Sequence, residues 1–286
     1  MPDWLPPIRI FNYQTGPKIA QVFKTQGNES LKFFILLLSP LRRLLVLVLL
    51  GGLSLQLYFF LRVALCLLVD PSSTSFERSE AFRITQIPAE SSYFLPQIKL
   101  PWLQDWRPYT LISSNIKRAV IVSEDDTFST HVGVQWEALE RAWANNNKAQ
   151  AYVEHYNKGP HKQIKIVGGS TITQQLAKNL FLSKERTLLR KAQELIITFE
   201  LETILSKSRI LEIYLNHVEW GRGVFGVEGA ARHYFSRSSL QLSASEAAKL
   251  AVMLPRPKYF ERNLGSLYLS ERAQVIVSRM NSAKLP

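Results

Sequence analysis

The sequence predicts a mostly helical domain that follows one membrane-spanning helix. Three observations point to this fold class. A long apolar run without charges lies near the N-terminus, apolar residues recur at helical spacing through much of the remaining chain, and no convincing ladder of alternating strands is present. Because 46% of the 286 residues are hydrophobic, the chain can also bury a sizeable core.

Residues 1–40 are expected to form a cytoplasmic tail. The first 31 residues are polar, and Pro6-Pro7, Gly16-Pro17 and Gly27-Asn28 interrupt them, which is typical of a poorly ordered segment. Basic residues outnumber acidic ones before the apolar run, and the positive-inside rule therefore places the N-terminus in the cytoplasm. The basic residues are Arg9, Lys18, Lys24, Lys32, Arg42 and Arg43.

The membrane-spanning helix is expected over residues 41–69. No charge occurs from Leu44 to Leu61, and the apolar run continues after Arg62, so the segment is long enough to cross a bilayer. Arg62 can extend its guanidinium toward the far headgroups. A cleaved signal peptide is disfavoured because the run is too long and no small-x-small site ends it. Everything after Asp70 is then expected outside the inner membrane.

Residues 70–115 are expected to be a linker followed by a membrane-proximal segment. The run Pro71–Ser75 has the composition of a linker, and the stretch to Pro108 shows neither helical nor strand periodicity. Trp102 and Trp106 suit either packing along the domain or a position at the bilayer interface. The sequence leaves both alternatives open.

The domain of residues 116–286 begins with a buried segment that leads to Glu124. Phe128 and Val132 are four residues apart and are predicted to form a core pair, so that Glu124 faces open space at the end of a packed element. His131 has two interpretations: a structural histidine that holds the acidic turn by a hydrogen bond, which is favoured, or a group that transfers protons.

A helix is predicted to begin after Thr171, because Gln174 three residues later completes a capping box. Its N-terminus, preceded by two glycines, is predicted to bind an anion such as a phosphate. Gln175 and Lys178 share one face of this helix. The core side is formed by Ile172, Leu176 and Leu180.

The region from Thr187 to Ser206 is predicted to be the central helix of the domain, buried on most sides. Its helical pattern consists of Leu188, Ala192, Leu195 and Phe199. Further helices are expected around residues 210–215, 228–235, 243–254 and 270–280, with a turn-rich loop at 221–229.

Four sequence blocks carry a resemblance to a known family. In chain order they are Glu124 to Gly133, Gly168 to Asn179, Arg190 to Glu194 and Ile210 to Asn216. They match E-D-x-x-F-x-x-H-x-G, G-G-S-T-I-T-Q-Q-L-x-K-N, R-K-x-x-E and I-L-x-x-Y-L-N. The chain thus resembles the glycosyltransferase domain of the bacterial peptidoglycan polymerases, and the resemblance covers roughly Ile116 to the C-terminus. It implies a lysozyme-like fold with two lobes, a head and a membrane-proximal jaw.

The resemblance also implies a reaction. The 4-hydroxyl of lipid II attacks the anomeric carbon of a glycan chain held by undecaprenyl pyrophosphate, with inversion and release of the pyrophosphate. Glu124 matches the general base, and Glu194 matches a second essential glutamate near the leaving group. Glu194 either orients Arg190 and Lys191 or carries a divalent cation, Mg or Mn, bound with the pyrophosphate.

The substrate-binding residues expected from the resemblance and from the capped helix are polar or basic. They are Arg141, Ser170, Thr171, Gln174, Gln175, Lys178, Arg186, Arg190 and Lys191. Gln135 departs from the aspartate that many family members have. The basic segment 145–167 corresponds to the family's mobile jaw, and is either a lid touching headgroups or a disordered insertion.

Two other classes of function stay open from the residues alone. A lysozyme-like hydrolase or lytic transglycosylase also uses a glutamate, but it does not need a pyrophosphate-binding set. A non-catalytic scaffold of the cell-wall machinery needs neither glutamate. A transpeptidase domain is not expected, because Ser114 to Lys117 is the sole S-x-x-K match and neither S-D-N nor K-T-G follows it. The chain is therefore expected to be monofunctional.

The charge of the chain restricts its partners. The formal net charge is +12, and most of the excess follows residue 70. The predicted topology and the lack of a recognised motif exclude nucleic acid, whereas anionic headgroups and a lipid pyrophosphate both lie at the membrane face. The expected partners are lipid II, the growing glycan, inner-membrane lipids and other cell-wall synthases. The expected location is the inner membrane, with a periplasmic catalytic domain.

Overall fold

The computed structural model describes residues 16–86, 102–137, 140, 144, 169–183, 185 and 187–286. The chain forms two compact units, Met1–Tyr58 and Phe59–Pro286. Helices account for most of the described residues, which confirms the predicted mostly helical class.

The first unit contains most of α1 (Gly16–Leu65), a helix of 50 residues. Within α1, the stretch Pro40–Leu65 is long and apolar enough to cross a membrane, as the sequence predicted. Two boundaries differ from the prediction. The tail that was expected to be irregular is helical from Gly16. Gly27 and Asn28 do not stop the helix, because glycine costs a helix only about 1 kcal/mol relative to alanine. At the other end, the helix stops at Leu65 rather than at residue 69.

The last turns of α1 belong to the second unit and pack there. Phe59, Val63 and Cys66 are buried, and the Phe59 ring meets Phe181 edge-on with centroids 6.0 Å apart. The Arg62 guanidinium lies 5.9 Å from the centroid of the same Phe181 ring. The C-terminal end of the apolar run, which was predicted as part of the membrane span, therefore packs in the protein core.

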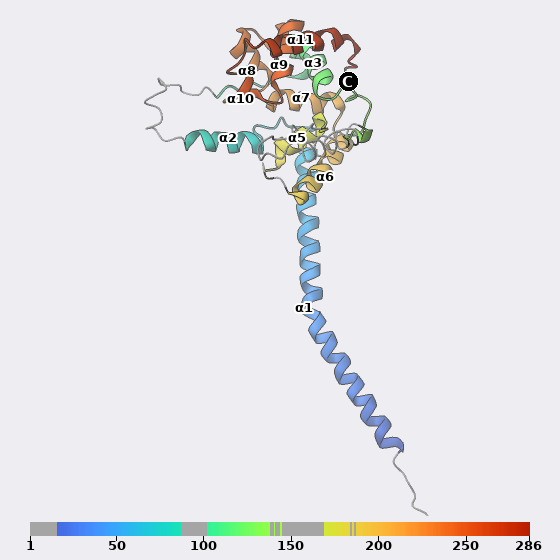
Figure 1. The fold of residues 1–286 in the computed structure, drawn as a ribbon. Coiled ribbons are helices and arrows are strands. Elements are labelled where there is room, and N and C mark those ends of the chain that lie inside the picture. Colours follow the sequence, from blue (N-terminus) through green and yellow to red (C-terminus); the bar gives the residue numbers. More distant parts are fainter. Residues whose placement is uncertain are drawn as a thin grey trace, which may run out of the picture. The chain divides into compact units, whose positions relative to one another are not determined.

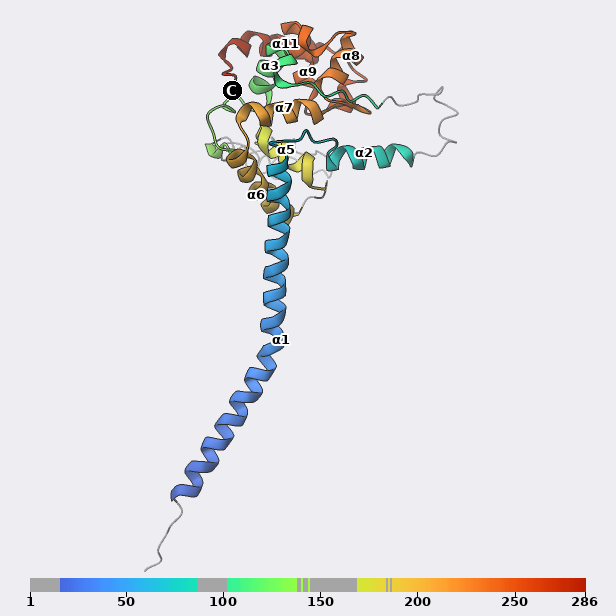
Figure 2. The ribbon, with the colours of Figure 1, turned by 180° about the vertical axis from the view of Figure 1, so that it is seen from behind.

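The second unit consists of short helices in two layers. Figures 1 and 2 show α3, α8, α9 and α11 in one layer and α5 and α6 in the other, with α7 between them. The packing of α3 and α11 on α9, and of α6 and α7 on α5, builds these layers. The helices are α2 (Ser75–Thr85), α3 (Ser114–Glu124), α5 (Ile172–Phe181), α6 (Leu188–Ile204), α7 (Lys207–His217), α8 (Val227–Phe235), α9 (Ala244–Met253), α10 (Pro257–Phe260) and α11 (Leu267–Arg279).

The short elements complete this unit. Among the described residues of this unit, 3-10 turns occur at Tyr109–Leu111, Ser239–Gln241 and Met280–Ser282. The glycine-rich loop expected at 221–229 overlaps a small antiparallel hairpin of β1 (Glu219–Gly221) and β2 (Val224–Phe225), and its last residues belong to α8. Its two strands are too short to give the alternating pattern that predicts a strand.

Part of the segment predicted as a linker belongs to the domain. Helix α2 begins after Thr74, whose side chain forms a full capping box with Glu77. The sequence T-S-F-E carried this signal, but its short helix lacks a strong apolar stripe. Further on, the Leu103 backbone donates to the Gly223 carbonyl and accepts from the Phe225 N–H, each at 2.9 Å. Residues 102–115 are thus packed against the fold.

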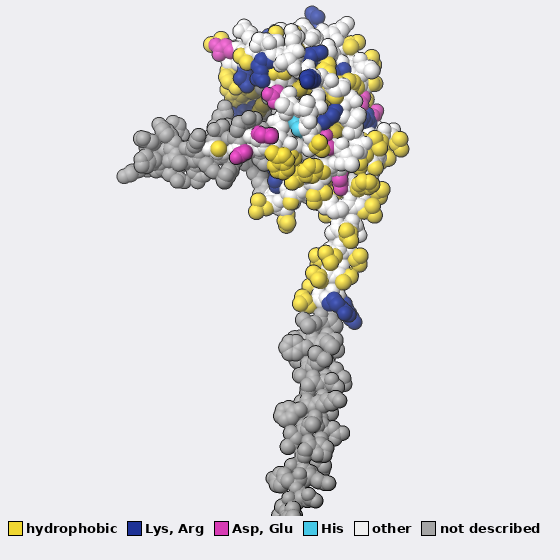
Figure 3. Space-filling view, turned by 90° about the vertical axis from the view of Figure 1, so that its right-hand side faces the viewer, with side chains coloured by type: hydrophobic (Ala, Val, Ile, Leu, Met, Phe, Trp, Pro, Cys, Tyr) yellow, Lys and Arg dark blue, Asp and Glu magenta, His cyan; other side chains and the backbone are white. Residues whose placement is uncertain are grey.

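Helix α6 does not have the environment that its sequence predicts. Its buried residues are Glu194, Ile197, Thr198 and Leu201. Leu188 is 90% exposed, and Ala192 and Phe199, of the predicted core stripe, are exposed as well. The prediction of a central helix was therefore wrong: one face of α6 packs on α5, and an apolar face is exposed. Figure 3 shows hydrophobic side chains gathered on the lower part of the second unit.

Candidate active site

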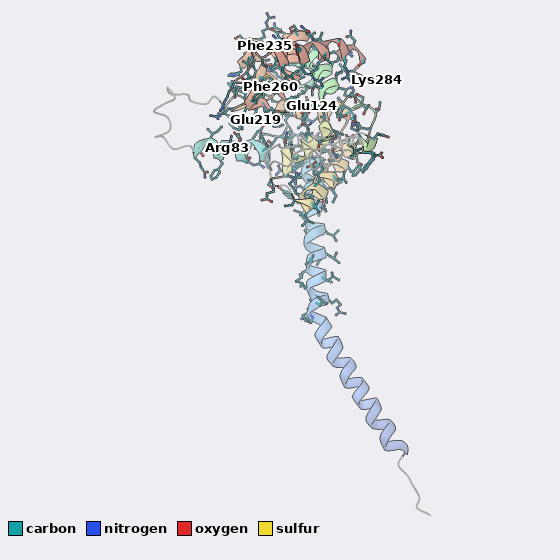
Figure 4. All side chains as sticks on the ribbon, in the orientation of Figure 1. Arg83, Glu124, Glu219, Phe235, Phe260 and Lys284 are labelled. Atoms are coloured by element: carbon teal, nitrogen blue, oxygen red, sulfur yellow. The ribbon has the colours of Figure 1, made fainter. Side chains whose placement is uncertain are left out.

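Helix α3 carries Glu124 to the site. Ser113 caps the helix by accepting a hydrogen bond from the Asn115 N–H. Ile116, Val120 and Ile121 are buried, which fixes the rotation of the helix and leaves Glu124 as its last residue. Figure 4 labels Glu124 between the two helical layers. The predicted position of this glutamate at the end of a packed element is confirmed. The open space predicted in front of it is not: the residue is half-buried, and it is not among the residues that line the cleft described below.

The turn after α3 is organised by Asp125, which is 3% exposed. One carboxylate oxygen accepts hydrogen bonds from His131 Nε2 at 2.8 Å and Gln135 Nε2 at 2.9 Å, and the other accepts from the Ile172 backbone N–H at 3.0 Å. His131 therefore has the structural role that the sequence favoured. Gln135 also contributes to holding the acidic turn.

The contact between Asp125 and Ile172 changes the interpretation of α5. The sequence predicted that the N-terminus of this helix binds a substrate anion. In the structure a buried carboxylate of the protein, Asp125, already accepts from the first N–H of the helix and sits at the positive end of its dipole. The anion at this helix end is therefore Asp125, which joins two motifs that are 47 residues apart.

The capping box at the start of α5 is confirmed, with reciprocal hydrogen bonds between Thr171 and Gln174. Thr171 also donates its hydroxyl hydrogen bond to the Gly133 carbonyl at 2.6 Å and is only 2% exposed. These contacts give Thr171 a structural role, and its predicted role in substrate binding stays a prediction. Gly133 has a φ of +77°, and a Cβ there would lie 2.7 Å from Thr198 Cγ2, so this position requires glycine.

One further residue of the acidic block departs from its prediction. Phe128 is fully buried, but Val132, its expected core partner, is 65% exposed. The turn after Asp125 is not helical through Val132, so the two side chains do not share a helix face. The prediction of a core pair was wrong because residues four apart share a face only in a helix.

A cleft of about 290 Å³ lies beside α5 and the start of α6. Of the predicted substrate-binding residues, it brings together Ser170, Gln174, Gln175, Lys178, Arg190 and Lys191, with Glu194. Its remaining lining residues, which sequence reasoning did not single out, are Phe76, Asn179, Leu182, Ser183 and Glu185. Phe76 belongs to α2. The capping box at Thr74, which starts this helix, was the sequence signal that could have placed α2 beside the cleft. Arg141, Arg186 and the segment 145–167 lie outside the described residues.

The second glutamate lies within an ion-pair cluster at the wall of the cleft. Arg190 Nη1 is 2.8 Å from Glu194 Oε2, and Lys191 Nζ is 2.5 Å from Glu194 Oε1. The Glu194 side chain is only 4% exposed, and Arg190 Nε is buried without a hydrogen-bond partner among the described residues. Of the two predicted roles of Glu194, this geometry supports the orientation of Arg190 and Lys191.

The donor set does not fit a divalent cation in this arrangement. Both oxygens of Glu194 are taken by cationic partners, and Mg²⁺ prefers carboxylates that are free to ligate, together with phosphate oxygens and water. Among the residues the structure describes, no cluster of three or more His, Cys, Asp or Glu side chains is arranged to hold a metal. The predicted metal role of Glu194 therefore finds no support in its contacts.

Glu124 has a different environment. Gln175 Nε2 donates a hydrogen bond to Glu124 Oε2 at 2.8 Å, and the hydroxyl of buried Tyr214 donates to Gln175 Oε1 at 3.1 Å. Burial raises the pKa of the Glu124 carboxyl, and nearby Asp125 adds to this, whereas the Gln175 hydrogen bond and the charge of Lys178 oppose it. The net effect is a raised pKa, which suits a general base.

These features define a class of protein. A helical domain with a polar cleft, several cations on the cleft wall and a carboxylate with a raised pKa nearby is typical of an enzyme that transfers a group from an anionic donor. Comparison with known sequences then gives the family. The transglycosylase family profile matches residues 97–281, and this chain belongs to that family.

Curated relatives agree with this assignment. The biosynthetic peptidoglycan transglycosylases of Janthinobacterium sp. (strain Marseille) and Herminiimonas arsenicoxydans are each 48% identical over 234 residues, which cover 82% of this chain and 92% of the relative. The protein of the same name from Paraburkholderia xenovorans (strain LB400) is 47% identical over 234 residues, 82% of this chain and 88% of the relative. The family match starts before residue 116, in keeping with the packing of residues 102–115 against the fold.

Proposed function

We propose that this protein polymerises the glycan chains of peptidoglycan from lipid II, with Glu124 as the general base. The site assignment rests on a basic carboxylate that lies next to a group of cations. A carboxylate with a raised pKa contacts Gln175 of the cleft wall, and the cations Lys178, Arg190 and Lys191 line the same cleft.

In this reaction Glu124 removes the proton from the 4-hydroxyl of the incoming lipid II. The hydroxyl oxygen forms a bond to the anomeric carbon of the growing chain while the bond from that carbon to the pyrophosphate oxygen breaks. The proton remains on Glu124 Oε until solvent removes it, and the electron pair of the broken bond leaves with undecaprenyl pyrophosphate. A raised pKa keeps the carboxylate basic enough for this transfer.

The leaving pyrophosphate needs positive charge, and the chain supplies it from α5 and α6. Lys178 and Lys191 are exposed, and Arg190 has a buried Nε without a protein acceptor among the described residues. Glu194 holds the two α6 cations at fixed positions, so that they meet the developing charge without rearrangement. Arg141 and Arg186 are proposed to join them, on the basis of the sequence resemblance alone.

A divalent cation bound with the substrate pyrophosphate is a separate proposal. Such an ion would neutralise part of the pyrophosphate charge. Polymerisation is measured after complete chelation and again after addition of Mg or Mn. Undiminished turnover by the chelated enzyme would show that the basic side chains are sufficient.

Membrane lipids are the proposed partner of the outward face of α6. Leu188, Leu189, Ile196 and Phe199 are exposed on it, and large exposed apolar patches are typical of contact sites. In proteoliposomes, tryptophan at position 189 is expected to be quenched by brominated acyl chains. The control is tryptophan at Leu240, an exposed leucine on the turn before α9. Equal quenching at both positions, or none at 189, would contradict the proposal.

The proposed location is the bacterial inner membrane, with the N-terminus in the cytoplasm and the second unit in the periplasm. The basic residues before the apolar stretch support this orientation. A reporter that is active only outside the cytoplasm, fused after Ser75, is expected to be active. Activity of a cytoplasm-specific reporter at the same fusion point would reverse the orientation.

The deciding experiment is a polymerisation assay with purified full-length protein and labelled lipid II. The expected product is a long polymer that lysozyme digests, and Glu124→Gln is the matched inactive control. Failure of the parent protein to form polymer, or release of short fragments from finished peptidoglycan, would favour a scaffold or a lytic enzyme instead.

A further inference from the structure

We infer that Tyr214 is a positioning residue for the general base: its hydroxyl fixes the side-chain amide of Gln175 so that the NH₂ group, and not the carbonyl, faces Glu124. This inference rests on the proposed role of Glu124. It concerns a side chain that never needs to contact the substrate.

The geometry is a short chain of hydrogen bonds from three helices. Tyr214 of α7 donates to Gln175 Oε1 at 3.1 Å, and Gln175 of α5 donates through Nε2 to Glu124 Oε2, at the end of α3, at 2.8 Å. Tyr214 is 1% exposed, and burial raises the pKa of its hydroxyl, to which the charges of Glu124 and Asp125 add. The hydroxyl therefore keeps its proton and acts as a hydrogen-bond donor.

The direction of this chain matters because an amide can bind a carboxyl group in two ways. With NH₂ toward Glu124 it stabilises the carboxylate, which is the form a base needs. With the amide reversed, its carbonyl would accept from a protonated Glu124 and repel a charged one. Reversal would also leave the Tyr214 hydroxyl proton without its acceptor in a buried position, at a cost typical of an unsatisfied buried donor. Tyr214, on α7, thereby favours the ionised form of Glu124 without contacting it.

The other charged groups around Glu124 do not replace this effect. Asp125, next to it in sequence, favours the protonated form, and Lys178 of α5 favours the ionised form by its charge. Neither group selects the orientation of the Gln175 amide. The inference also explains why Gln175, predicted as a substrate-binding residue, has both ends of its amide engaged by protein.

The test is the pH dependence of polymerisation by the full-length enzyme, measured as kcat/KM over roughly pH 5 to 9. In Tyr214→Phe the acid limb is expected to move up by about one pH unit, because the Gln175 amide is then free to turn its carbonyl toward a protonated Glu124 and stabilise that form. Rates should fall about tenfold well below the limb, while the plateau at high pH stays within about threefold of the parent.

A matched control is available elsewhere in the fold. Tyr234→Phe removes the hydroxyl of a half-buried tyrosine, which donates to the Trp220 carbonyl at 2.8 Å and lies outside the cleft lining. Its acid limb should coincide with that of the parent. In a Gln175→Leu background, which should show the raised limb by itself, adding Tyr214→Phe is expected to cause no further shift.

The outcomes separate the inference from the proposed function. Polymerisation by Glu124→Gln within tenfold of the parent would refute the base assignment itself. If Glu124→Gln is inactive and Tyr214→Phe loses activity equally at all pH values, or keeps the parental profile, Tyr214 does not position the base. If thermal melting shows that Tyr214→Phe does not fold, Gln175→Leu decides, and an unmoved acid limb in that variant overturns the inference.

Discussion

Glu124 and Glu194 are two glutamates with opposite surroundings. Glu124 receives one neutral hydrogen bond, from Gln175, and its carboxyl has a raised pKa. Glu194 has a cation on each oxygen, Arg190 at 2.8 Å and Lys191 at 2.5 Å. Both oxygens of Glu194 are engaged by cations, whereas Glu124 is buried with a single neutral amide donor, which leaves its other oxygen available for a proton.

In the proposed function, this difference divides the work of one site between two similar side chains. Glu124 is suited to accept a proton on the acceptor side, and Glu194 is suited to hold cations for the leaving group. The predictions below test whether the two roles separate experimentally.

The largest effect is expected for Glu124→Gln. The amide keeps the size of the side chain but cannot take a proton, so polymerisation should fall at least roughly a hundredfold. Binding of moenomycin, a phosphoglycolipid mimic of the donor, should stay nearly unchanged because the cations remain. Polymerisation is measured with labelled lipid II and binding by fluorescence anisotropy. The contrasting variant is Lys178→Ala, which should weaken inhibitor binding roughly ten- to a hundredfold.

Glu194→Gln should show the second pattern. Loss of its charge leaves Arg190 and Lys191 without their shared partner, so both polymerisation and moenomycin binding should fall, each about ten- to a hundredfold. The same two assays are used. A variant that lost polymerisation but bound the inhibitor like the parent would remove the distinction between the two glutamates.

Much of this site follows from the sequence, and the reasons for the remainder are physical. The capping box at Thr171 and the buried stripe of α5 depend on neighbours within one helix, so spacing alone predicts them. The occupation of the α5 N-terminus by Asp125 depends on a contact between residues far apart in the chain. The same holds for the contact between Tyr214 and Gln175.

The fold shows the same division. Helices α7, α8 and α9 were predicted within a few residues because the periodicity of their sequences and, for α9, the capping box at Ser243 are local. The exposed leucines of α6 misled the prediction, since an apolar pattern reports hydrophobicity and not whether protein or another apolar surface covers it. Residues 102–115 lack periodicity because their backbone pairs with distant loops.

The pH dependence gives a smaller but graded effect. Because burial raises the pKa of Glu124 above the ordinary carboxyl value, kcat/KM should fall about tenfold per unit as the pH drops through that raised pKa.

The raised pKa of Glu124 has the opposite effect on the stability of the fold. The cost of keeping Glu124 charged is fully present above its folded-state pKa and absent below its unfolded-state pKa, so Glu124→Gln should melt at a higher temperature than the parent at neutral pH. Thermal melting at neutral and acidic pH measures the difference, and a lower melting temperature at neutral pH would contradict the burial argument.

The smallest effect is expected where the ion-pair cluster reaches solvent. The Lys191 side chain is 48% exposed, whereas that of Arg190 is 16% exposed and has a buried Nε without a partner among the described residues. Lys191→Ala should therefore weaken moenomycin binding only a few-fold and change the unfolding free energy less than Arg190→Ala does, because solvent screens the half-exposed lysine more strongly. Arg190→Ala should weaken binding considerably more, because it removes the more buried cation and leaves Glu194 with the exposed lysine alone. Inhibitor titrations and chemical denaturation of both variants give the comparison. Equal losses in the two variants would mean that total charge, and not the fixed position that Glu194 gives to Arg190, determines how the donor pyrophosphate is bound.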